Sequence, residues 1–556
     1  MVERIGEADL AGARAAVHNA VGGFDGGTLR EIVSAAAGAL TSGGADVPRL
    51  LPDGALPPLL DEVLAASAAD PLDAIDWFDY TAPGGINVYI SGGGQNVREM
   101  DNNSAYKTRP LDAAETAAIM DVLDNYEAVA DVAFTIVEDI AEADFVIMES
   151  NNATSALGYF EVGGGPLRYD GTVYDLEGWG VMNGKGAGWT TAGVAVGGYG
   201  YVTLIHEFGH GMGLAHPHDD GGGSDVMNGV SSPFNDYGSN GLNQGVFTTM
   251  SYNDGWPTSD HGTSGSDDYG WQGTLMALDI AALQRKYGAN MTTNAGDDVY
   301  VLPEINAPGT FYSCIWDVGG IDRIEAGGAT NVVIDLRAAT LDYSGTGGGP
   351  VSFAKGIYGG FTIASQVEIE DATGGGGNDL LIGNDLANTI LGEGGKDSIL
   401  GNGGRDTIDG GAGKDTIDGG SGSDSLTGGN GVDSILGGGG RDIIDGGAGN
   451  DRLEGGGGID YFVVAGDWGK DRIADFSEGT DQCVLLLLRD LNGGAALTFD
   501  QIILTDVSEG TRMHLDIDED GTKDQLDLDG DGDIDKAHVT FETLTADQLS
   551  SDDFMF

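Results

Sequence analysis

Cysteine is almost absent from this sequence of 556 residues, since Cys314 and Cys483 are the only two and lie 169 positions apart. This scarcity excludes a CxxC zinc site and a dense disulfide framework, so two inert thiols are expected. Basic residues are also scarce, with 25 Lys and Arg against 89 Asp and Glu and a formal charge of −64. Such an acidic chain repels phosphate backbones and anionic membrane surfaces, which argues against nucleic acid as a partner.

Long apolar runs are missing as well. The sequence begins Met-Val-Glu-Arg-Ile-Gly-Glu-Ala-Asp, and no apolar run stands behind a basic segment there. This beginning argues against a cleavable secretory signal peptide, and no stretch is long enough to span a bilayer. We therefore expect no membrane insertion, and any export must use another kind of export signal.

The length predicts two or three domains rather than one. Ala-rich helical spacing around Leu29 to Leu40 and Leu59 to Ala66 indicates a pro-segment or an accessory region. The predicted divisions are 1–78 for that region, 79–292 for an α/β domain, 293–373 for a strand-rich connection, 374–463 for repeats and 464–556 for a C-terminal cap.

The predicted α/β domain mixes two hydrophobic periods. Its strand-like runs are Asn87 to Ile90, Val132 to Val137, Phe145 to Met148 and Gly193 to Gly197. Its helical runs are Leu111 to Tyr126, Tyr201 to Gly211 and Leu275 to Tyr287. This mixture is typical of one domain with a sheet and packed helices.

A nine-residue period occupies residues 374–463. Ten consecutive nonapeptides there follow GGxGxDxUx without insertion or deletion, and only the second is degenerate, with Asn388 at its sixth position. The eighth position is always apolar, which predicts an all-β parallel β-helix, or β-roll, with these side chains stacked inside. Asp stands at the sixth position in the other nine repeats, as Asp379, Asp397, Asp406, Asp415, Asp424, Asp433, Asp442, Asp451 and Asp460.

These repeats predict several structural calcium ions, because GGxGxD loops bring backbone carbonyls and Asp carboxylates together around hard cations. A Gly-rich flexible linker is the alternative, but a linker has no reason to repeat an apolar residue and a carboxylate every nine positions. Backbone ordering costs roughly 1–2 kcal/mol per residue, which one large apolar group per repeat does not offset. Calcium is therefore expected to be part of the fold, and the repeats to be disordered without it.

Two DxDxDGxxD segments near the C-terminus resemble the first half of an EF-hand loop. Alternating carboxylates around a turn glycine suit calcium, yet neither segment has Glu at position twelve, so an acidic surface loop is the alternative. The candidate ligands are Asp516, Asp518, Asp520, Asp524, Asp527, Asp529, Asp531 and Asp535.

The segment from His206 to His216 reads HEFGHGMGLAH. On a helix, His206 and His210 project from one face and can hold one zinc ion. Gly213 suits a left-handed turn that ends the helix and brings His216 in as a third ligand. A lone HExxH also occurs by chance on polar helix faces, but three protein ligands with one open position are typical of catalytic rather than structural zinc.

Glu207 follows the first His and so lies beside the metal instead of binding it. Its carboxylate can take a proton from a zinc-activated water and return it to a leaving group. This arrangement predicts hydrolysis assisted by one zinc ion, with Glu207 as general base and acid.

These residues carry a family resemblance. HExxHxxGxxH followed by Thr249-Met250-Ser251-Tyr252 resembles the metzincin peptidases, and the serralysin group in particular. Pro217 and the segment from Leu278 to Asn290 are also similar, and that group pairs such a domain with a nonapeptide calcium solenoid. The resemblance covers roughly residues 80 to 490. It implies an α+β metzincin catalytic domain, with a mixed sheet and helices, over residues 79–292.

The same resemblance implies further roles and one departure. Met250 would form the turn beneath the zinc, and Tyr252 would stabilise the tetrahedral oxyanion, although core packing is the alternative for both. His218 stands where these enzymes commonly have Gly, and we interpret it as a loop residue. An exposed polar role is expected for it and for the other four histidines outside the motif, which are His18, His261, His514 and His538.

The chain ends Asp552-Asp553-Phe554-Met555-Phe556, which resembles the acidic-then-apolar tail of exoproteins exported in one step by an ABC-type (type I) channel. A frayed terminus is the alternative. Calcium loops matched to millimolar extracellular calcium also favour secretion.

Two functions compete on this evidence. The first is a secreted, monomeric zinc endopeptidase that cuts protein and peptide substrates, bound as an extended strand along a sheet edge for which residues 157–162 are the candidate. The alternative is a calcium-dependent surface or adhesive protein with a vestigial peptidase domain. The intact histidine set, Glu207 and Tyr252 favour the first.

Overall fold

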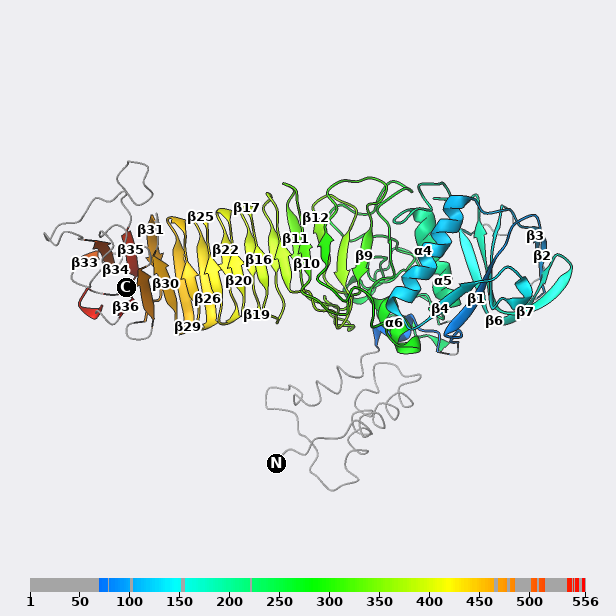
Figure 1. Cartoon of the computed structure of the whole chain (residues 1–556), viewed down its shortest axis with the longest axis horizontal. Coiled ribbons are helices and arrows are strands. Elements are labelled where there is room, and N and C mark those ends of the chain that lie inside the picture. The colour runs from blue at the N-terminus through cyan, green and yellow to red at the C-terminus, as the bar shows by residue number, and fades with distance from the viewer. Residues whose placement is uncertain are drawn as a thin grey trace, which may run out of the picture. The chain divides into compact units, whose positions relative to one another are not determined.

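In the computed structural model of the chain, Pro71–Phe556 form one unit, which is separate from Met1–Asp70 in the sequence (Figure 1). The predicted pro-segment, apart from residues 70–78, and all eight C-terminal DxDxDG ligands lie outside the described residues. The structure describes residues 70–556 except 79, 101–103, 152–155, 221–222, 465–468, 478–480, 486–501, 508–509, 516–537, 543, 545, 550–552 and 556.

A seven-stranded mixed sheet with the order β3-β2-β6-β7-β5-β1-β4 organises the first half of the unit Pro71–Phe556. Strands β7, β5, β1 and β4 run parallel, whereas β6 and β2 pair with antiparallel neighbours. The strands are β1 (Gly85–Ile90), β2 (Asn96–Glu99), β3 (Ala105–Lys107), β4 (Ala133–Ile136), β5 (Phe145–Ser150), β6 (Gly158–Tyr169) and β7 (Thr172–Asn183). The helices are α4 (Ala113–Val129), α5 (Tyr199–Gly211) and α6 (Ala277–Tyr287), with short 3-10 turns at Pro71–Ala74, Ile140–Glu142, Ser239–Gly241 and Ala546–Gln548.

Local sequence signals explain most of these elements. Every residue of β5 is buried, as expected for an apolar run in the middle of a sheet. Helix α4 begins with a capping box, in which the Asp112 carboxylate accepts from the backbone N–H groups of Ala114 and Glu115. The three predicted helices and the predicted strands at β1, β4 and β5 are confirmed, with ends that differ by a few residues.

The predicted strand Gly193–Gly197 is wrong, because these residues form turns that lead into α5. The N–H of Val194 donates to the carbonyl of Thr190, 2.9 Å away. A Cβ on Gly193 would lie 2.1 Å from the carbonyl oxygen of Gly188. The backbone at Gly193 therefore contacts the backbone at Gly188. These local contacts take the place of the hydrogen bonds to a neighbouring strand that a β-strand needs.

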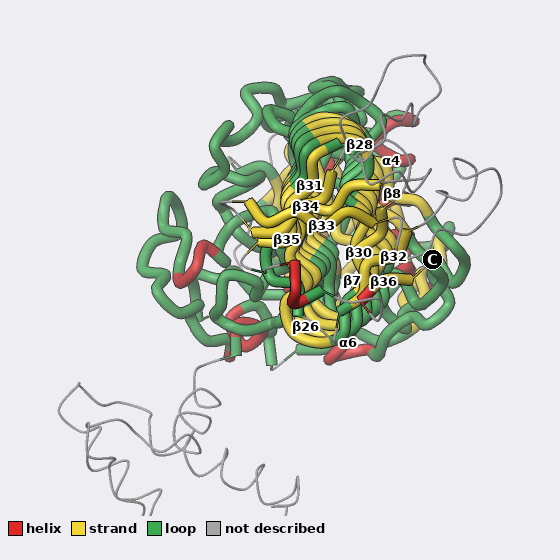
Figure 2. Tube along the Cα trace, turned by 90° about the vertical axis from the view of Figure 1, so that its left-hand side faces the viewer, coloured by secondary structure: helices red, strands yellow, loops and turns green. Residues whose placement is uncertain are grey.

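The nonapeptides form the stacked strands of a β-roll (Figure 1). Equivalent strands are 18 residues apart, so one coil holds two repeats; Thr389 pairs with Thr407, and Thr407 with Ser425. The apolar eighth positions are buried along the inside, as predicted. Figure 2 looks along the stack and shows the strands superposed.

Three sheets make up this part of the chain. The ten-stranded sheet holds β8 (Val299–Val301), β10 (Arg323–Glu325), β14 (Asp371–Thr373), β16 (Thr389–Leu391), β20 (Thr407–Asp409), β24 (Ser425–Thr427), β27 (Ile443–Asp445), β30 (Tyr461–Val464), β32 (Gln482–Leu485) and β36 (Phe554–Met555). The fifteen-stranded sheet holds β9 (Tyr312–Ile315), β11 (Val332–Asp335), β12 (Ser352–Ala354), β13 (Gly360–Ile363), β15 (Leu380–Ile382), β18 (Ser398–Leu400), β19 (Gly403–Gly404), β22 (Thr416–Asp418), β23 (Ser421–Gly422), β26 (Ser434–Gly440), β29 (Arg452–Gly458), β31 (Lys470–Ile473), β33 (Ile502–Val507), β34 (Gly510–Leu515) and β35 (His538–Glu542). The four-stranded sheet holds β17 (Gly394–Gly395), β21 (Ala412–Gly413), β25 (Asn430–Gly431) and β28 (Ala448–Gly449).

Parallel stacking extends beyond the nonapeptides on both sides. Strand β10 pairs with β8 before the first repeat, and β31 and β32 continue the stack after the last one. Phe554, in the export-like tail, is buried in β36, which pairs with β32. Stacking of the strands needs only backbone hydrogen bonds and apolar inner residues, whereas the Gly and Asp positions form the loops. The roll can therefore extend beyond the residues that carry the nonapeptide motif.

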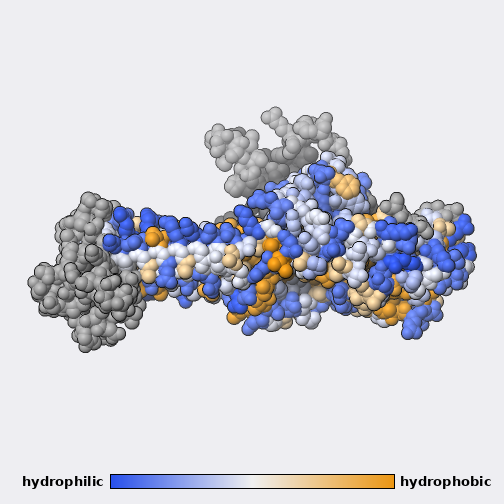
Figure 3. Space-filling view, turned by 90° about the horizontal axis from the view of Figure 1, so that it is seen from above, coloured by the Kyte–Doolittle hydropathy of each residue, from blue (hydrophilic) through white to orange (hydrophobic). Residues whose placement is uncertain are grey.

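The surface of the described residues is largely polar. Hydrophilic residues predominate on the face that Figure 3 shows. None of the helices in the described part of the chain has both the length and the apolar character that crossing a bilayer requires.

Candidate metal centre and active site

Helix α5 and the loop after it bring three imidazoles together. Nε2 of His216 lies 3.1 Å from Nε2 of His206 and 3.0 Å from Nε2 of His210. The turn that returns the chain is made by Gly213, whose φ is 84° and where a Cβ would lie 2.7 Å from the carbonyl oxygen of Tyr80. Only glycine fits both the left-handed conformation and the close approach.

The other nitrogen of each ring is held by an acceptor. Nδ1 of His206 donates to the carbonyl of Thr249 at 2.8 Å, and Nδ1 of His210 donates to that of Leu214 at 2.9 Å. Nδ1 of His216 pairs with the Asp219 carboxylate at 2.7 Å. Because carbonyl oxygens cannot donate, these bonds place the proton on Nδ1 and leave the Nε2 lone pairs facing one another.

The electrostatics of the cluster keep the rings of His206 and His210 neutral. Burial, followed by the neighbouring His216, lowers the pKa of His206 to about 3, and burial with both neighbouring rings lowers the pKa of His210 well below its usual range. Nitrogen lone pairs that face one point repel each other unless a cation lies between them. The donor type, number and fixed tautomers fit zinc.

Glu207 lies against the sheet beside this cluster. Its side chain is 7% exposed, and burial raises the pKa of its carboxyl to about 8. A Cβ on Gly158, the first residue of β6, would lie 3.0 Å from Cγ of Glu207. The start of β6 therefore packs closely on the Glu207 side chain.

Met250 and Tyr252 lie on one turn but differ in burial. Met250 is fully buried, and its sulfur would be 2.6 Å from a Cβ on Gly209 of α5, so it packs under the helix. Tyr252 is 37% exposed, with its ring centre 4.6 Å from that of His216. Burial, followed by the charge of Glu207, raises the pKa of Tyr252 to about 12, so its hydroxyl stays a donor.

Asp279 of α6 fixes this turn, a role that sequence reasoning did not assign. Its buried carboxylate accepts from the Thr248 hydroxyl at 2.6 Å and from the Thr249 N–H at 2.7 Å. The Thr249 carbonyl in turn holds His206. The signal was present in the sequence as an acidic residue at the start of a predicted helix, but its partners lie about 30 residues away.

His218 does not have the exposed role expected of it. It is half-buried, with its ring stacked on His216 at 4.9 Å and its Nδ1 without a hydrogen-bond partner. His261 is also half-buried, with Nε2 3.0 Å from the Tyr312 hydroxyl. Contacts from distant segments cover both rings, which a loop pattern in the sequence does not show.

A buried ion pair anchors the segment before β1 to the loop after α5. Asp76 forms an isolated bridge with Leu214, and its carboxylate lies 2.5 Å from Nζ of Lys286 on α6. The ring of Trp77 stacks on His210 with centres 5.1 Å apart. Residues 75–77 therefore brace both the end of α5, which carries His210, and the loop that leads to His216.

Replacing Asp76 with asparagine is expected to lower the free energy of unfolding by about 3–5 kcal/mol, because it leaves the buried Lys286 ammonium without a carboxylate and with only the carbonyls of Trp77 and Tyr80 as partners. Asp76 is 3% exposed and the Lys286 side chain 6%. Urea unfolding followed by tryptophan fluorescence measures the loss. The control is Asp73→Asn, whose ion pair with Arg285 is about one-third exposed and should cost at most about 1 kcal/mol. Equal small losses in both variants would contradict the bracing role.

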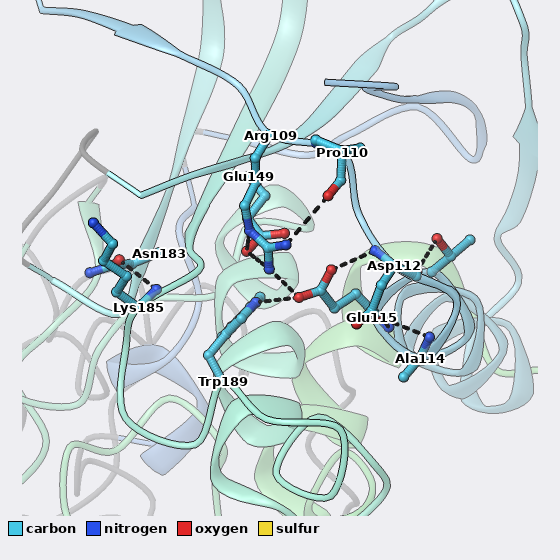
Figure 4. Close-up of polar contacts among 10 residues, drawn as sticks. Arg109, Pro110, Asp112, Ala114, Glu115, Glu149, Asn183, Lys185 and Trp189 are labelled. Carbon is cyan, nitrogen blue, oxygen red and sulfur yellow. Dashed lines mark hydrogen bonds and ion pairs between the residues drawn. The ribbon is translucent and has the colours of Figure 1, made fainter. Parts of the chain in front are cut away.

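A second charged cluster joins α4 to the end of β5 (Figure 4). The Arg109 guanidinium pairs with both Glu115 and Glu149, and the indole N–H of Trp189 donates to Glu115 at 3.0 Å. Burial, followed by the charge of Glu115, raises the pKa of Glu149 to about 8. Since Trp189 lies in the loop before α5, the cluster links the sheet, α4 and the segment that leads into α5.

The repeat carboxylates form a ladder inside the roll. Oδ1 of each sixth-position Asp accepts from a backbone N–H one coil earlier, as between Asp397 and Asp379 at 2.9 Å. Asn388 takes the same position in the degenerate repeat and donates its N–H to Asp406. The second oxygen, Oδ2, is buried without a hydrogen-bond partner in Asp397, Asp406, Asp415, Asp424, Asp433, Asp442 and Asp451. Buried unpartnered carboxylate oxygens in register suit calcium.

Sequence reasoning missed a related cluster ahead of the repeats. Ligand atoms of Asp298, Asp317 and Asp322 lie within 4.8 Å of one another. Asp322 is fully buried, and its Oδ2 has no hydrogen-bond partner. The signal was Gly319-Gly320-Ile321-Asp322, a fragment of the repeat motif outside the regular period.

Comparisons with known proteins agree with the calcium repeats and with the metallopeptidase resemblance. Residues 373–408, 391–426 and 427–462 match the family described as RTX calcium-binding nonapeptide repeat (4 copies). Serralysin of Proteus mirabilis is 36% identical over 206 residues, which cover 35% of this chain and 38% of that protein. Metalloprotease AprA of Pseudomonas entomophila is 35% identical over 273 residues, which cover 45% of this chain and 52% of that protein. These findings support a serralysin-type protein with RTX repeats.

The matched stretches of this chain span about half or less of those relatives' own length. Among solved structures, the AlgE6R3 subunit of the Azotobacter vinelandii mannuronan C5-epimerase is 23% identical, with a TM-score of 0.16, and covers 34% of this chain and 82% of that one. The RTX match agrees with the observed parallel roll and indicates calcium binding by the repeats.

Proposed function

We propose that this serralysin-type protein is a secreted zinc endopeptidase whose fold calcium stabilises. The observation that carries the proposal is the set of three converging Nε2 atoms with fixed tautomers beside a buried glutamate. His206, His210 and His216 would hold the zinc ion in a metzincin-type α+β domain. A zinc ion there would supply Lewis acidity, which polarises a carbonyl and acidifies water.

Glu207 moves the protons in this mechanism. Its carboxylate takes a proton from the attacking water and gives it to the leaving amine once the peptide bond breaks. Burial raises its pKa to about 8, close to the working range of an acid and base near neutrality. The Tyr252 hydroxyl, which remains protonated, donates to the oxyanion that develops on the carbonyl.

The substrate binds as an extended strand beside β6. Residues Gly158–Val162 pair with β7 on one side, while β2 pairs with β6 only at Leu167–Tyr169. Among the described residues, no strand pairs with the other edge of Gly158–Val162. Because Gly158 packs on Glu207, a peptide added to this edge passes the proposed general base.

The proposal also includes calcium ions bound by the repeats, export by a type I (ABC) channel, an extracellular location and a monomeric state. The RTX match and the buried carboxylate ladder support the calcium ions.

Metal analysis combined with casein hydrolysis tests the function. We expect one zinc per chain, and hydrolysis that is lost with a zinc-selective chelator and restored by zinc at constant calcium. A chain fully loaded with calcium and zinc, with the N-terminal region trimmed, that cuts neither casein nor gelatin would favour the adhesive alternative.

A further inference from the structure

A cavity of about 440 Å³ opens next to the imidazole cluster. Tyr252 belongs to its wall, and the same ring lies 4.6 Å from that of His216. A group in the cavity is therefore close to the proposed reacting centre. Five aromatic side chains and one carboxylate dominate the lining, namely Tyr199, Phe234, Tyr237, Tyr252, Trp271 and Asp254.

Phe234 is presented to this cavity by a braced loop. Its side chain is 59% exposed, with its ring centre 5.4 Å from that of Tyr252. The Ser231 N–H donates to the Asp236 carboxylate at 2.7 Å, and the Asn235 N–H donates to the side-chain oxygen of Asn253 at 2.7 Å. An exposed aromatic ring on a loop held at both ends is preorganised for a ligand, since little entropy is lost on binding.

Asp254 places a negative charge in the same wall. The Tyr199 hydroxyl donates to its Oδ2 at 3.2 Å, and the Tyr199 ring packs against Trp271 with centres 4.8 Å apart. None of the residues that line the cavity, all in the described part of the chain, is basic. The carboxylate therefore has no cationic partner within the cavity wall.

This combination favours one kind of occupant. Aromatic faces attract cations and pack against methylene groups, and a carboxylate pairs with an ammonium or guanidinium head. An aliphatic side chain would satisfy the rings but strip water from Asp254 without replacing its hydrogen bonds, which is costly. An acidic side chain would be repelled. The formal charge of −64 also attracts basic substrates.

We propose that this cavity selects a lysine or arginine side chain of the substrate next to the bond that is cut. The inference rests on the proposed peptidase function and deepens it. Asp254 acts as the specificity-determining residue and pairs with the cationic head. The exposed ring of Phe234, stacked on Tyr252, packs against the methylene stem.

A peptide-library cleavage profile of the full chain, loaded with calcium and zinc, tests this selection. We expect Lys and Arg to be enriched at one position adjacent to the cut. In Asp254→Asn, the ratio of kcat/KM for an Arg peptide to that for its Leu counterpart should fall about tenfold or more, as expected when a charged hydrogen bond is lost. Asp260→Asn, an exposed carboxylate on the same segment, should leave the ratio unchanged.

Phe234→Ala provides a second variant, because its exposed ring can be removed without opening a core. It should lower the same ratio by weakening the cation–π contact. Casein hydrolysis without Lys or Arg enrichment in the wild-type profile would overturn this inference and leave the peptidase function standing. A ratio unchanged in both variants would overturn it as well. Failure of the loaded wild-type chain to cut any peptide would instead overturn both proposals.

Discussion

Replacing Glu207 with glutamine should lower kcat by roughly 10²–10⁴-fold, the usual contribution of a general acid–base group. The amide has nearly the same shape but cannot take a proton from water. The three imidazoles are held by Thr249, Leu214 and Asp219, not by Glu207, so the zinc content should stay at one per chain. Turnover of a quenched-fluorescent peptide and metal analysis of the same sample measure the two quantities.

The matched control for this change is Glu177→Gln, which makes the same substitution at an exposed position of β7. It should keep wild-type turnover. If Glu207→Gln retained near wild-type kcat with zinc bound, the acid–base role would be refuted. If it lost zinc, the effect would be one of binding, and the proposed division of roles between the imidazoles and the carboxylate would be wrong.

Removing calcium should unfold the β-roll at neutral pH. Seven repeat carboxylates have a buried Oδ2 without a hydrogen-bond partner, and the ladder places these charges in register. Each occupied site stabilises the fold by about 4 kcal/mol when free calcium exceeds its Kd about 1,000-fold. Circular dichroism should lose β-structure in EDTA and recover it on adding calcium, but not magnesium, which demands tighter octahedral geometry. An unchanged spectrum in EDTA would contradict a calcium-dependent fold.

Acid should partly replace calcium in this roll. Burial raises the pKa of Asp397 and Asp406 to about 7 in the folded chain. A group whose folded pKa is raised contributes stability that is present below its unfolded pKa, near 4, and is lost as the pH rises through about 7. In EDTA, the roll should therefore keep more β-structure at pH 5 than at pH 8, as measured by circular dichroism. Equal loss of β-structure at both pH values would contradict buried carboxylates in the calcium-free fold.

The sequence indicated the β-roll and the histidine cluster because the residues of each follow a regular spacing over short distances in the chain. A nine-residue period fixes the strand, the apolar inner position and the carboxylate of every coil. A four-residue spacing places His206 and His210 on one helix face, and Gly213 permits the turn toward His216. Each of these relations is decided by the local backbone geometry of neighbouring residues.

Periodicity failed where glycines allow the backbone to fold tightly on itself. Gly193–Gly197 reads as a strand, but its backbone packs on Gly188 and forms turns instead. The roll also continues past the last nonapeptide, since backbone pairing and buried residues such as Phe554 need no Gly or Asp motif.

The sequence by itself determined the three histidines, Glu207 and the calcium repeats as candidates, because each belongs to a local pattern. Only the tertiary structure decided what surrounds them. It brought Asp279 under the turn that holds His206, Asp76 and Trp77 beside His210, and Tyr199, Phe234 and Asp254 into one cavity wall. These groups are tens to hundreds of residues apart, and their meeting depends on how the sheet, α5 and α6 pack, which no local period encodes.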